Sequence, residues 1–329
     1  MIHYITTSHL TYQTISTMSI AHFIREIGRG KEGARDLPRD LACEVMTKVL
    51  LGSVDPLALG AFCIAMRIKG ETPEEMLGFL DAVHAQMQVL TNYELQPVIV
   101  LPSYNGSRRL PLLTPLLAKI LAHRGHAVLI HGAHTEDTRV STQEVLYSLG
   151  IEPNTTTQAI AKGEVVFAPT RLLCEGIWSL LQVRRQTGLR NSAHSLVKLM
   201  NPVLGPSIQV ASYTHPEYAL SMQATLEGMK ANALLLRGTE GEPVADPRRM
   251  PNMRCFIQGQ AFTQLDIASQ VAHDTIDMPL GMNAMQTAEL IDAMIHGSKP
   301  IPPPIQAQAE LISRLSLACM DQSVRNDTP

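Results

Sequence analysis

Aromatic side chains are scarce in this 329-residue sequence: they make up 4% of it, with a single tryptophan. The core must therefore consist mainly of Leu, Ile, Val, Met and Ala. No stretch approaches the roughly 18 apolar residues of a membrane span, so we expect no membrane-embedded segment. The first 17 residues lack a basic start followed by an apolar stretch. They are not expected to act as a secretory signal, and we predict a disordered tail or a mis-assigned start over 1–17.

Paired cysteines are also missing. The five cysteines lie far apart, with no Cys-x-x-Cys motif and no histidine at a zinc-site spacing. Such an odd, scattered set favours reduced core thiols and a cytoplasmic location. The sequence contains no P-loop, no Gly-x-Gly-x-x-Gly and no His-Glu-x-x-His motif. Taken alone, the residues therefore carry no standard catalytic or metal-binding signature.

What is present is a change of pattern near residue 93. Before it, apolar residues recur at helical spacing, and Thr72 and Glu75 have the spacing of a helix-capping box. After residue 96, short apolar runs alternate with helical segments, as in strands buried on both faces of a sheet. These runs lie at 97–101, 127–130, 165–168, 208–211 and 233–236.

Strands that alternate with helices imply right-handed crossovers and a mostly parallel sheet. We therefore predict an α/β fold with a small helical-bundle domain over residues 18–92 and a larger α/β domain over 93–329. The segment from about 171 to 201 is expected to be helical throughout and to complete the helical domain. A proline-rich run at 300–304 precedes a final helix predicted near 306–319.

Two groups of polar residues have both a functional and an ordinary interpretation. The run from His131 to Asp137 follows a predicted strand, where α/β proteins place ligand loops; the alternative is a plain polar connection. Arginine pairs at 108–109, 184–185 and 248–249 are usually solvated faces when judged by composition. Because the net charge is −3, nucleic-acid binding would require such pairs to converge on one surface.

Several motifs, in the same order, resemble those of anthranilate phosphoribosyltransferases. The run LGSVDPLALGAF from Leu51 leads to the sequence from Arg67 to Thr72, which is similar to that family's R-x-K-G-E-T signature. The stretch 144–150 resembles its D-V-L-E-A-L-G helix, and 188–191 with 200–202 resembles its G-I-R-T…T-N-P segment. The resemblance implies a nucleoside-phosphoribosyltransferase-type fold, commonly a homodimer through the helical domain. In the enzymes it also implies a cleft that binds phosphoribosyl pyrophosphate and magnesium.

The family's pyrophosphate loop, G-T-G-G-D, falls here on Pro102-Ser-Tyr-Asn-Gly106. Close backbone approach to phosphate favours small residues with free N–H groups, whereas Pro102 has no N–H and Tyr104 adds bulk. We therefore expect the phosphate cradle to be lost. What the resemblance leaves is a degenerate phosphate pocket, composed of Ser103, Asn105, Gly106, Thr114, His131 and Gly132.

The remaining catalytic motifs of the family are also altered. Its N-x-S-T motif falls on 111–114 with Leu113 at the magnesium-binding serine, and its K-H-G-N motif on 130–133 without the Lys and Asn. Its acidic D-E pair falls on Pro243-Val244, which offers no hard oxygen ligand. Since charge stabilisation is the main contribution a protein makes to this transfer, we predict no catalytic residue, no metal and no cofactor.

Two basic positions and several motifs point to one subgroup of the family. Arg184 matches the arginine that contacts the carboxylate of anthranilate, and Lys198 replaces a proline of that pocket. The sequences at 26–31, 102–106 and 190–194 resemble a non-catalytic, DNA-binding subgroup. This resemblance implies a homodimer that binds DNA or RNA without sequence preference along a basic groove. The expected contacts are Lys198, Arg184, Arg185, Arg190, Arg108 and Arg109.

Two alternatives remain open at this point. One is a glycosyl- or phosphoribosyltransferase with an altered substrate, because the scaffold is retained although a shared fold does not carry a shared function. The other is a small-anion sensor or an interaction module.

Overall fold

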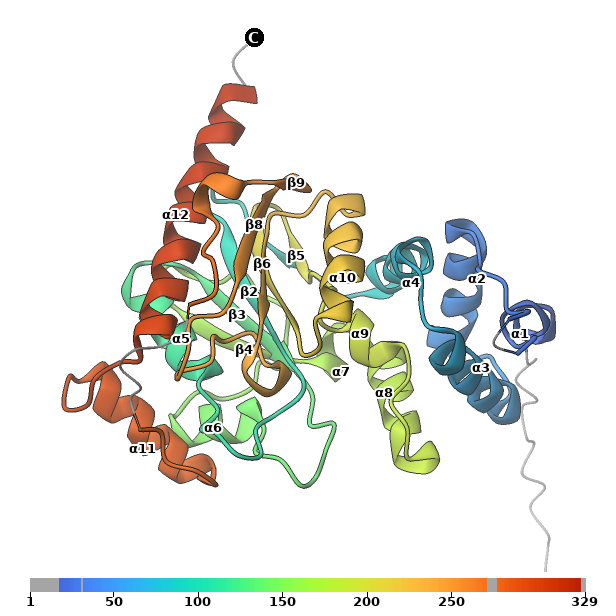
Figure 1. The fold of residues 1–329 in the computed structure, drawn as a ribbon, viewed down its shortest axis with the longest axis horizontal. Coiled ribbons are helices and arrows are strands. Elements are labelled where there is room, and N and C mark those ends of the chain that lie inside the picture. Colours follow the sequence, from blue (N-terminus) through green and yellow to red (C-terminus); the bar gives the residue numbers. More distant parts are fainter. Residues whose placement is uncertain (1–17, 31, 271–276, 327–329) are drawn as a thin grey trace, which may run out of the picture.

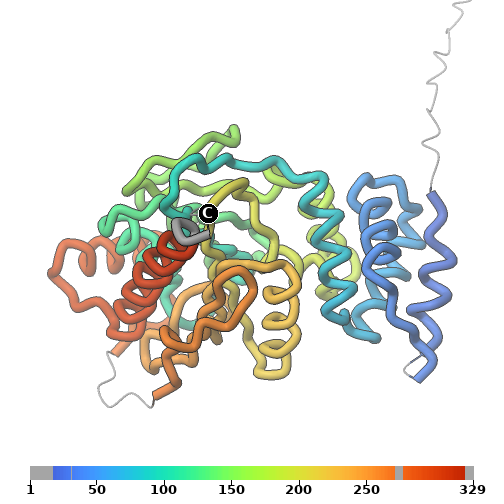
Figure 2. Tube along the Cα trace, turned by 90° about the horizontal axis from the view of Figure 1, so that it is seen from above, coloured from blue at the N-terminus to red at the C-terminus, as the bar shows by residue number. Residues whose placement is uncertain are grey.

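The chain folds into a helical part and an α/β part that stand side by side (Figure 1). The computed structural model describes residues 18–30, 32–270 and 277–326. The tail predicted over 1–17 lies outside the described residues. Seen from above, α1 to α3 occupy one end of the molecule and the last helix lies toward the other (Figure 2). No helix among the described residues is long and apolar enough to cross a membrane.

The helical part is built from α1 (Ala21–Ile27), α2 (Arg39–Leu50), α3 (Pro56–Lys69) and α4 (Pro73–Gln86). Asp55 starts α3 by accepting hydrogen bonds from the backbone N–H groups of Leu57 and Ala58. The capping box of Thr72 and Glu75 at the start of α4 is confirmed, with both of its reciprocal hydrogen bonds present.

The α/β part contains a seven-stranded sheet in the order β4-β3-β2-β6-β7-β8-β9. Its first five members are parallel: β4 (Val165–Pro169), β3 (Val128–Gly132), β2 (Val98–Ser103), β6 (Ser207–Tyr213) and β7 (Ala233–Arg237). All five predicted runs are thus strands, and the predicted fold class is confirmed. An antiparallel edge of β8 (Met253–Ile257) and β9 (Gln260–Ala261) extends the sheet. Separately, β1 (Leu90–Thr91) pairs with β5 (Val203–Leu204).

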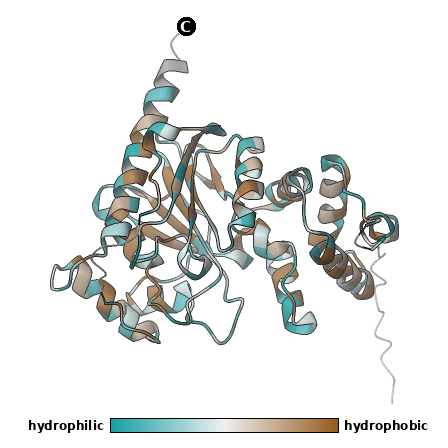
Figure 3. Cartoon of the chain, in the orientation of Figure 1, coloured by the Kyte–Doolittle hydropathy of each residue, from teal (hydrophilic) through white to brown (hydrophobic). Residues whose placement is uncertain are grey.

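The two faces of the sheet have different partners. Ile99 and Leu101 of β2 belong to a core shared with α5 (Thr114–His123), α6 (Thr142–Ser148), α11 (Ala284–Ile295) and α12 (Pro303–Asn326). Val98 and Val100, which alternate with them, belong to a core continuous with the helical part. The apolar colouring of the central strands in Figure 3 follows this double burial. The helix α10 (Glu217–Gly228) contacts both β6 and α4.

Two predictions of helix extent were wrong. The segment 171–201 is not continuously helical but consists of α7 (Thr170–Leu173), α8 (Glu175–Thr187) and α9 (Ala193–Leu196). Gly188 ends α8 because its φ of 71° is the left-handed conformation typical of a helix C-terminus. The last helix begins at Pro303 rather than near 306, since proline is tolerated in a first turn. As expected, α8 folds back onto α2. The domain limits 18–92 and 93–329 stay a prediction.

Candidate functional site

The loop after β2 contains an anion cradle, which consists of the backbone N–H groups of Asn105 and Gly106 and the hydroxyls of Ser103 and Thr114. A carboxylate of the chain itself fills it. The N–H groups donate to Oε1 of Glu242 at 2.7 and 2.8 Å. Thr114 Oγ1 donates to Oε2 at 3.2 Å, and Ser103 Oγ donates to the same oxygen. Glu242 is 1% exposed, so four donors enclose one buried anion.

A second carboxylate occupies the next turn of the same loop. The backbone N–H groups of Arg108, Arg109 and Leu110 donate to Glu240 at 2.9, 2.9 and 3.0 Å. Burial acts to raise the pKa of Glu240, but these three N–H groups outweigh it and lower that pKa overall. The segment after β7 therefore presents two glutamates, in turn, to two sets of backbone donors.

The backbone between the two glutamates makes this arrangement possible. Glu240 has a φ of 52° and Gly241 a φ of 90°, both in the left-handed region. A Cβ atom at Gly241 would collide with the side-chain amide of Asn105. That amide donates to the carbonyl of Glu240 at 2.9 Å, which fixes the turn against the cradle. Only glycine therefore fits between the two acidic residues.

Four arginines converge on one carboxylate beside the cradle. Oxygens of Glu136 lie 3.2 Å from Arg184, 3.3 Å from Arg139, 3.8 Å from Arg190 and 3.9 Å from Arg108. We call these four arginines the arginine cluster. Burial acts to raise the pKa of Glu136, but Arg184 and Arg139 more than offset it and the pKa is lowered. Arg139 also lies 3.7 Å from Glu240. Two carboxylates cannot neutralise four guanidinium groups, so the cluster keeps an excess of positive charge.

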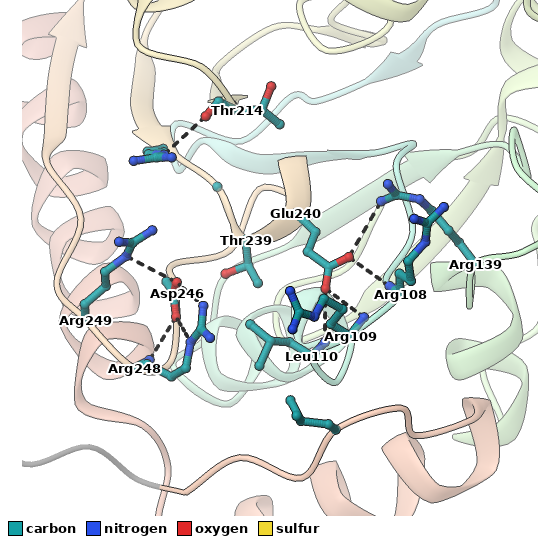
Figure 4. A pocket seen from close by; sticks show the side chains of 13 residues that line it. Arg108, Arg109, Leu110, Arg139, Thr214, Thr239, Glu240, Asp246, Arg248 and Arg249 are labelled. Atoms are coloured by element: carbon teal, nitrogen blue, oxygen red, sulfur yellow. Dashed lines mark hydrogen bonds and ion pairs between the residues drawn. The ribbon is translucent and has the colours of Figure 1, made fainter.

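Two cavities adjoin the cluster and share Thr214 in their walls. The first, here called the arginine pocket, has a volume of about 480 Å³ (Figure 4). The second, here called the cleft, has a volume of about 550 Å³ and lies between α10 and residues at the ends of α3 and α4. Arg67, Arg190 and Lys198 line the cleft.

Comparison with known proteins places the chain in a family. Residues 21–87 match the helical bundle domain of a glycosyl transferase family. An uncharacterized protein of Escherichia coli (strain K12), YbiB, is 38% identical over 297 residues, which cover 88% of this chain and 92% of that protein. The chain belongs to the anthranilate phosphoribosyltransferase-like family, in the subgroup of YbiB.

More distant members of this family agree with that placement. The anthranilate phosphoribosyltransferase of Thermus thermophilus is 25% identical over 206 residues, which cover 61% of this chain and 62% of that enzyme. A crystal structure of the anthranilate phosphoribosyltransferase from the same organism matches with a TM-score of 0.66 at 18% identity. It covers 92% of this chain and 98% of that one, and at this identity the match shows the fold. The family resemblance stated from the sequence motifs is confirmed.

In this YbiB-subgroup chain, the loop that was expected to lose its phosphate cradle still presents backbone N–H groups. The N–H groups of Asn105 and Gly106 both donate to Glu242, a carboxylate of the chain itself. The ring of Tyr104 does not obstruct the loop, because it is buried and its hydroxyl lies 2.8 Å from His131 Nδ1. The acidic pair of the family was expected at Pro243-Val244, and the sequence analysis did not consider Glu240 and Glu242, which lie just before it.

The residues do not fit the magnesium-bound pyrophosphate of the enzymes. Ser103 and Thr114 direct their hydroxyls to Glu242, and Leu113 is buried where the family has a metal-binding serine. Among residues 18–30, 32–270 and 277–326, no group of three or more His, Cys, Asp or Glu side chains could hold a metal. No step of a phosphoribosyl transfer can therefore be derived from this site.

The other members of the predicted phosphate pocket support the strands. His131 is fully buried and its burial lowers its pKa to about 3, so the ring is neutral. Gly132 lies so close to the Ser103 carbonyl that a Cβ would collide with it. These two positions pack β3 against β2.

The predicted nucleic-acid contacts lie in three different surroundings. Arg108, Arg184 and Arg190 belong to the arginine cluster, and Arg109 lines the arginine pocket. Arg185 is exposed and forms a bidentate pair with Asp137 at 2.7 and 2.8 Å.

Lys198 is only 9% exposed, and its Nζ donates to the Gly241 carbonyl at 3.0 Å. It therefore supports the turn that carries both glutamates. The sequence analysis missed Arg139 and Arg237, because each is a single arginine that lies outside the arginine pairs and the family motifs considered there.

Proposed function

We propose that this protein is non-enzymatic and binds DNA or RNA without sequence preference, as a homodimer. The observation that carries the proposal is the convergence of the four-membered arginine cluster on the single carboxylate of Glu136. This local excess of positive charge offsets the argument from the net charge of −3. Phosphate groups of a nucleic-acid backbone are the sequence-independent ligands of such a surface.

The position of the cluster between two cavities also supports the proposal. Arg190 of the cluster lines the cleft, and Arg108 and Arg139 line the arginine pocket. Because both cavities include Thr214, basic side chains continue from Arg67 through Arg190 of the cleft to Arg108 and Arg139, which also line the arginine pocket. A backbone that follows this path meets successive cations, as in proteins that bind single strands without reading their sequence.

An exposed apolar stripe on α3 supports a homodimer through the helical domain. Leu57 is 84% exposed and Ile68 is 68% exposed. Ala61 and Ile64 lie between them at helical spacing, so the four share one face of α3, which is largely hydrophobic in Figure 3. A second copy would cover this face, and the two-fold axis would double the basic groove.

Sedimentation equilibrium tests the homodimer. We expect the wild type to be a dimer and Leu57→Asp to be a monomer, because a buried unpaired carboxylate opposes association. The control is Leu317→Asp, which places the same charge at an exposed leucine of α12 and should leave the dimer intact. A dimer that survives Leu57→Asp excludes this face.

Nucleic-acid binding is tested by fluorescence anisotropy with short single- and double-stranded DNA over a salt series. The wild type should bind sequences alike, with affinity that falls steeply as salt rises. Arg108→Gln/Arg190→Gln should bind more weakly and lower the salt slope by about 2, since each duplex phosphate contact contributes about 0.9. The control Arg25→Gln/Arg254→Gln removes the same charge from exposed sites outside both cavities. No binding at low salt, or equal losses in both variants, would overturn the proposal.

One further assay tests the alternative that the protein is a transferase with an altered substrate. Because Glu242 fills the cradle, phosphoribosyl pyrophosphate with magnesium should neither stabilise the protein against heat nor release pyrophosphate. Release of pyrophosphate with any acceptor would overturn the non-enzymatic part of the proposal.

A further inference from the structure

Arginine is the most frequent residue type in the walls of the arginine pocket. Its walls come from the loop after β2, the end of β7 and the stretch before β8 (Figure 4). The basic residues that line it are Arg108, Arg109, Arg139, Arg237, Arg248 and Arg249. The carboxylates that line it are those of Glu240 and Asp246, and Glu136 outside the lining pairs with Arg108 and Arg139.

Both lining carboxylates already have partners, and some of these are arginines of the pocket itself: Oε2 of Glu240 lies 3.7 Å from Arg139. Glu240 accepts three backbone N–H groups of the neighbouring loop. Asp246 accepts from Arg248 at 2.9 Å and lies 3.3 Å from Nε of Arg249. Within the described parts of the chain, no carboxylate pairs with the side chain of Arg109 or of Arg237. The pocket therefore has guanidinium donors left over for an external anion.

The chemistry of these donors favours phosphate. Guanidinium groups bind phosphate oxygens in a planar, bidentate manner, and they remain charged at every physiological pH. Arg109 and Arg249 come from different walls, and a chain of phosphates offers an anionic group to each wall. Leu110 and Leu280 add an apolar surface, and a volume of about 480 Å³ lies within the range of small-molecule sites.

We propose that the arginine pocket binds a chain of two or more phosphate groups without magnesium, as in a nucleoside triphosphate, an inorganic oligophosphate or the 5′-triphosphate end of an RNA. Arg237 and Arg249 hold this ligand against Arg109. The site is separate from the filled cradle, and it stands whether or not the groove binds nucleic acid.

Calorimetric titration in the presence of EDTA tests the site. Inorganic tripolyphosphate and ATP should bind the wild type, and adenosine should not. Arg237→Gln/Arg249→Gln should weaken both ligands by tenfold or more, whereas the control Arg25→Gln/Arg254→Gln should bind them like the wild type. Absence of binding to the wild type, equal affinities in the two double variants, or equally tight binding of citrate would overturn the proposal.

A second titration identifies the source of the phosphate chain. One oligoribonucleotide is compared with a 5′-triphosphate and with a 5′-hydroxyl, using the wild type and Arg237→Gln/Arg249→Gln. A gain from the triphosphate that the double variant loses assigns the pocket to the end of a nucleic acid. No gain, with ATP binding retained, assigns it to a free oligophosphate. If the double variant weakens the 5′-hydroxyl strand as much as ATP, the arginines belong to the groove and the separate pocket is refuted.

Discussion

Glu242 and Glu136 are two carboxylates at the same edge of the sheet, and their surroundings differ in kind. Glu242 is buried and accepts only from neutral donors, namely backbone N–H groups and hydroxyls. Glu136 has a side chain that is 19% exposed and is approached by four arginines. Glu242 satisfies the hydrogen bonds of its neutral donors. Glu136 does not neutralise the charge of the arginines around it. Anion binding on this scaffold therefore depends on which donors the chain has left unused.

The largest effect is expected from Glu242→Ala. Four donors would lose their partner in a buried site, so the free energy of unfolding should fall by about 3 kcal/mol or more. Urea denaturation measures this fall. Inorganic phosphate should stabilise the variant more than the wild type, because it can occupy the vacated donors. Glu94→Ala, which removes an exposed carboxylate paired with Lys162, should change stability by less than about 1 kcal/mol. A loss below that value for Glu242→Ala would contradict the comparison.

Lys198 should make the stability of the protein depend on pH in the alkaline range. Burial lowers the pKa of Lys198 from 10.5 to about 8, although Glu242 acts to raise it. Between these two values the unfolded chain binds the proton more strongly than the folded one, so stability rises with pH across this window. Relative to Lys198→Met, the wild type should gain up to about 3 kcal/mol from pH 7 to pH 10.5. Urea denaturation of both proteins at several pH values measures the difference. A difference that stays constant over this range would contradict the assignment.

Removing the carboxylate of Glu136 should strengthen a property of the protein, its DNA affinity, rather than weaken one. Glu136→Gln deletes the negative charge on which the arginine cluster converges, so DNA affinity should rise by about fivefold, or about 1 kcal/mol, with a steeper salt slope. Fluorescence anisotropy measures both quantities. Weaker binding would mean that Glu136 arranges the arginines for their ligand rather than competing with it.

The smallest effect is expected from Arg185→Gln. Its guanidinium is already paired in bidentate fashion with Asp137, and both side chains are exposed. DNA affinity should change by less than about twofold, because the pair has little net charge to offer. A loss as large as that of Arg190→Gln in the same anisotropy assay would place Arg185 in the contact set on equal terms.

Much of the fold follows from local sequence signals. The five parallel strands were visible as short apolar runs, and the start of α4 was visible from Thr72 and Glu75. The strand β8 was not predicted, because Arg254 interrupts its apolar residues at an edge of the sheet. One exposed charged residue thus hides a strand from local patterns even where the residues after it, Cys255, Phe256 and Ile257, are buried.

The site was less predictable because its contacts are distant in sequence. Glu242 lies 137 residues from Asn105, so no local pattern links the two. Arg108 and Arg190 are brought to Glu136 from separate loops, so their shared surface with the neighbouring Arg139 emerges only in the folded chain. A doublet such as Arg184-Arg185 illustrates the limit: one member joins the cluster and the other pairs with Asp137.

The turn Glu240-Gly241-Glu242 has a consequence for engineering and for reading related sequences. Only glycine fits between the two acidic residues. The triplet acidic–Gly–acidic after β7 therefore identifies related sequences in which a glutamate or aspartate of the chain fills the anion cradle. A design that restored only the family's glycine loop would leave the internal anion in place. Any return to phosphoribosyl transfer must begin by rebuilding the turn after β7.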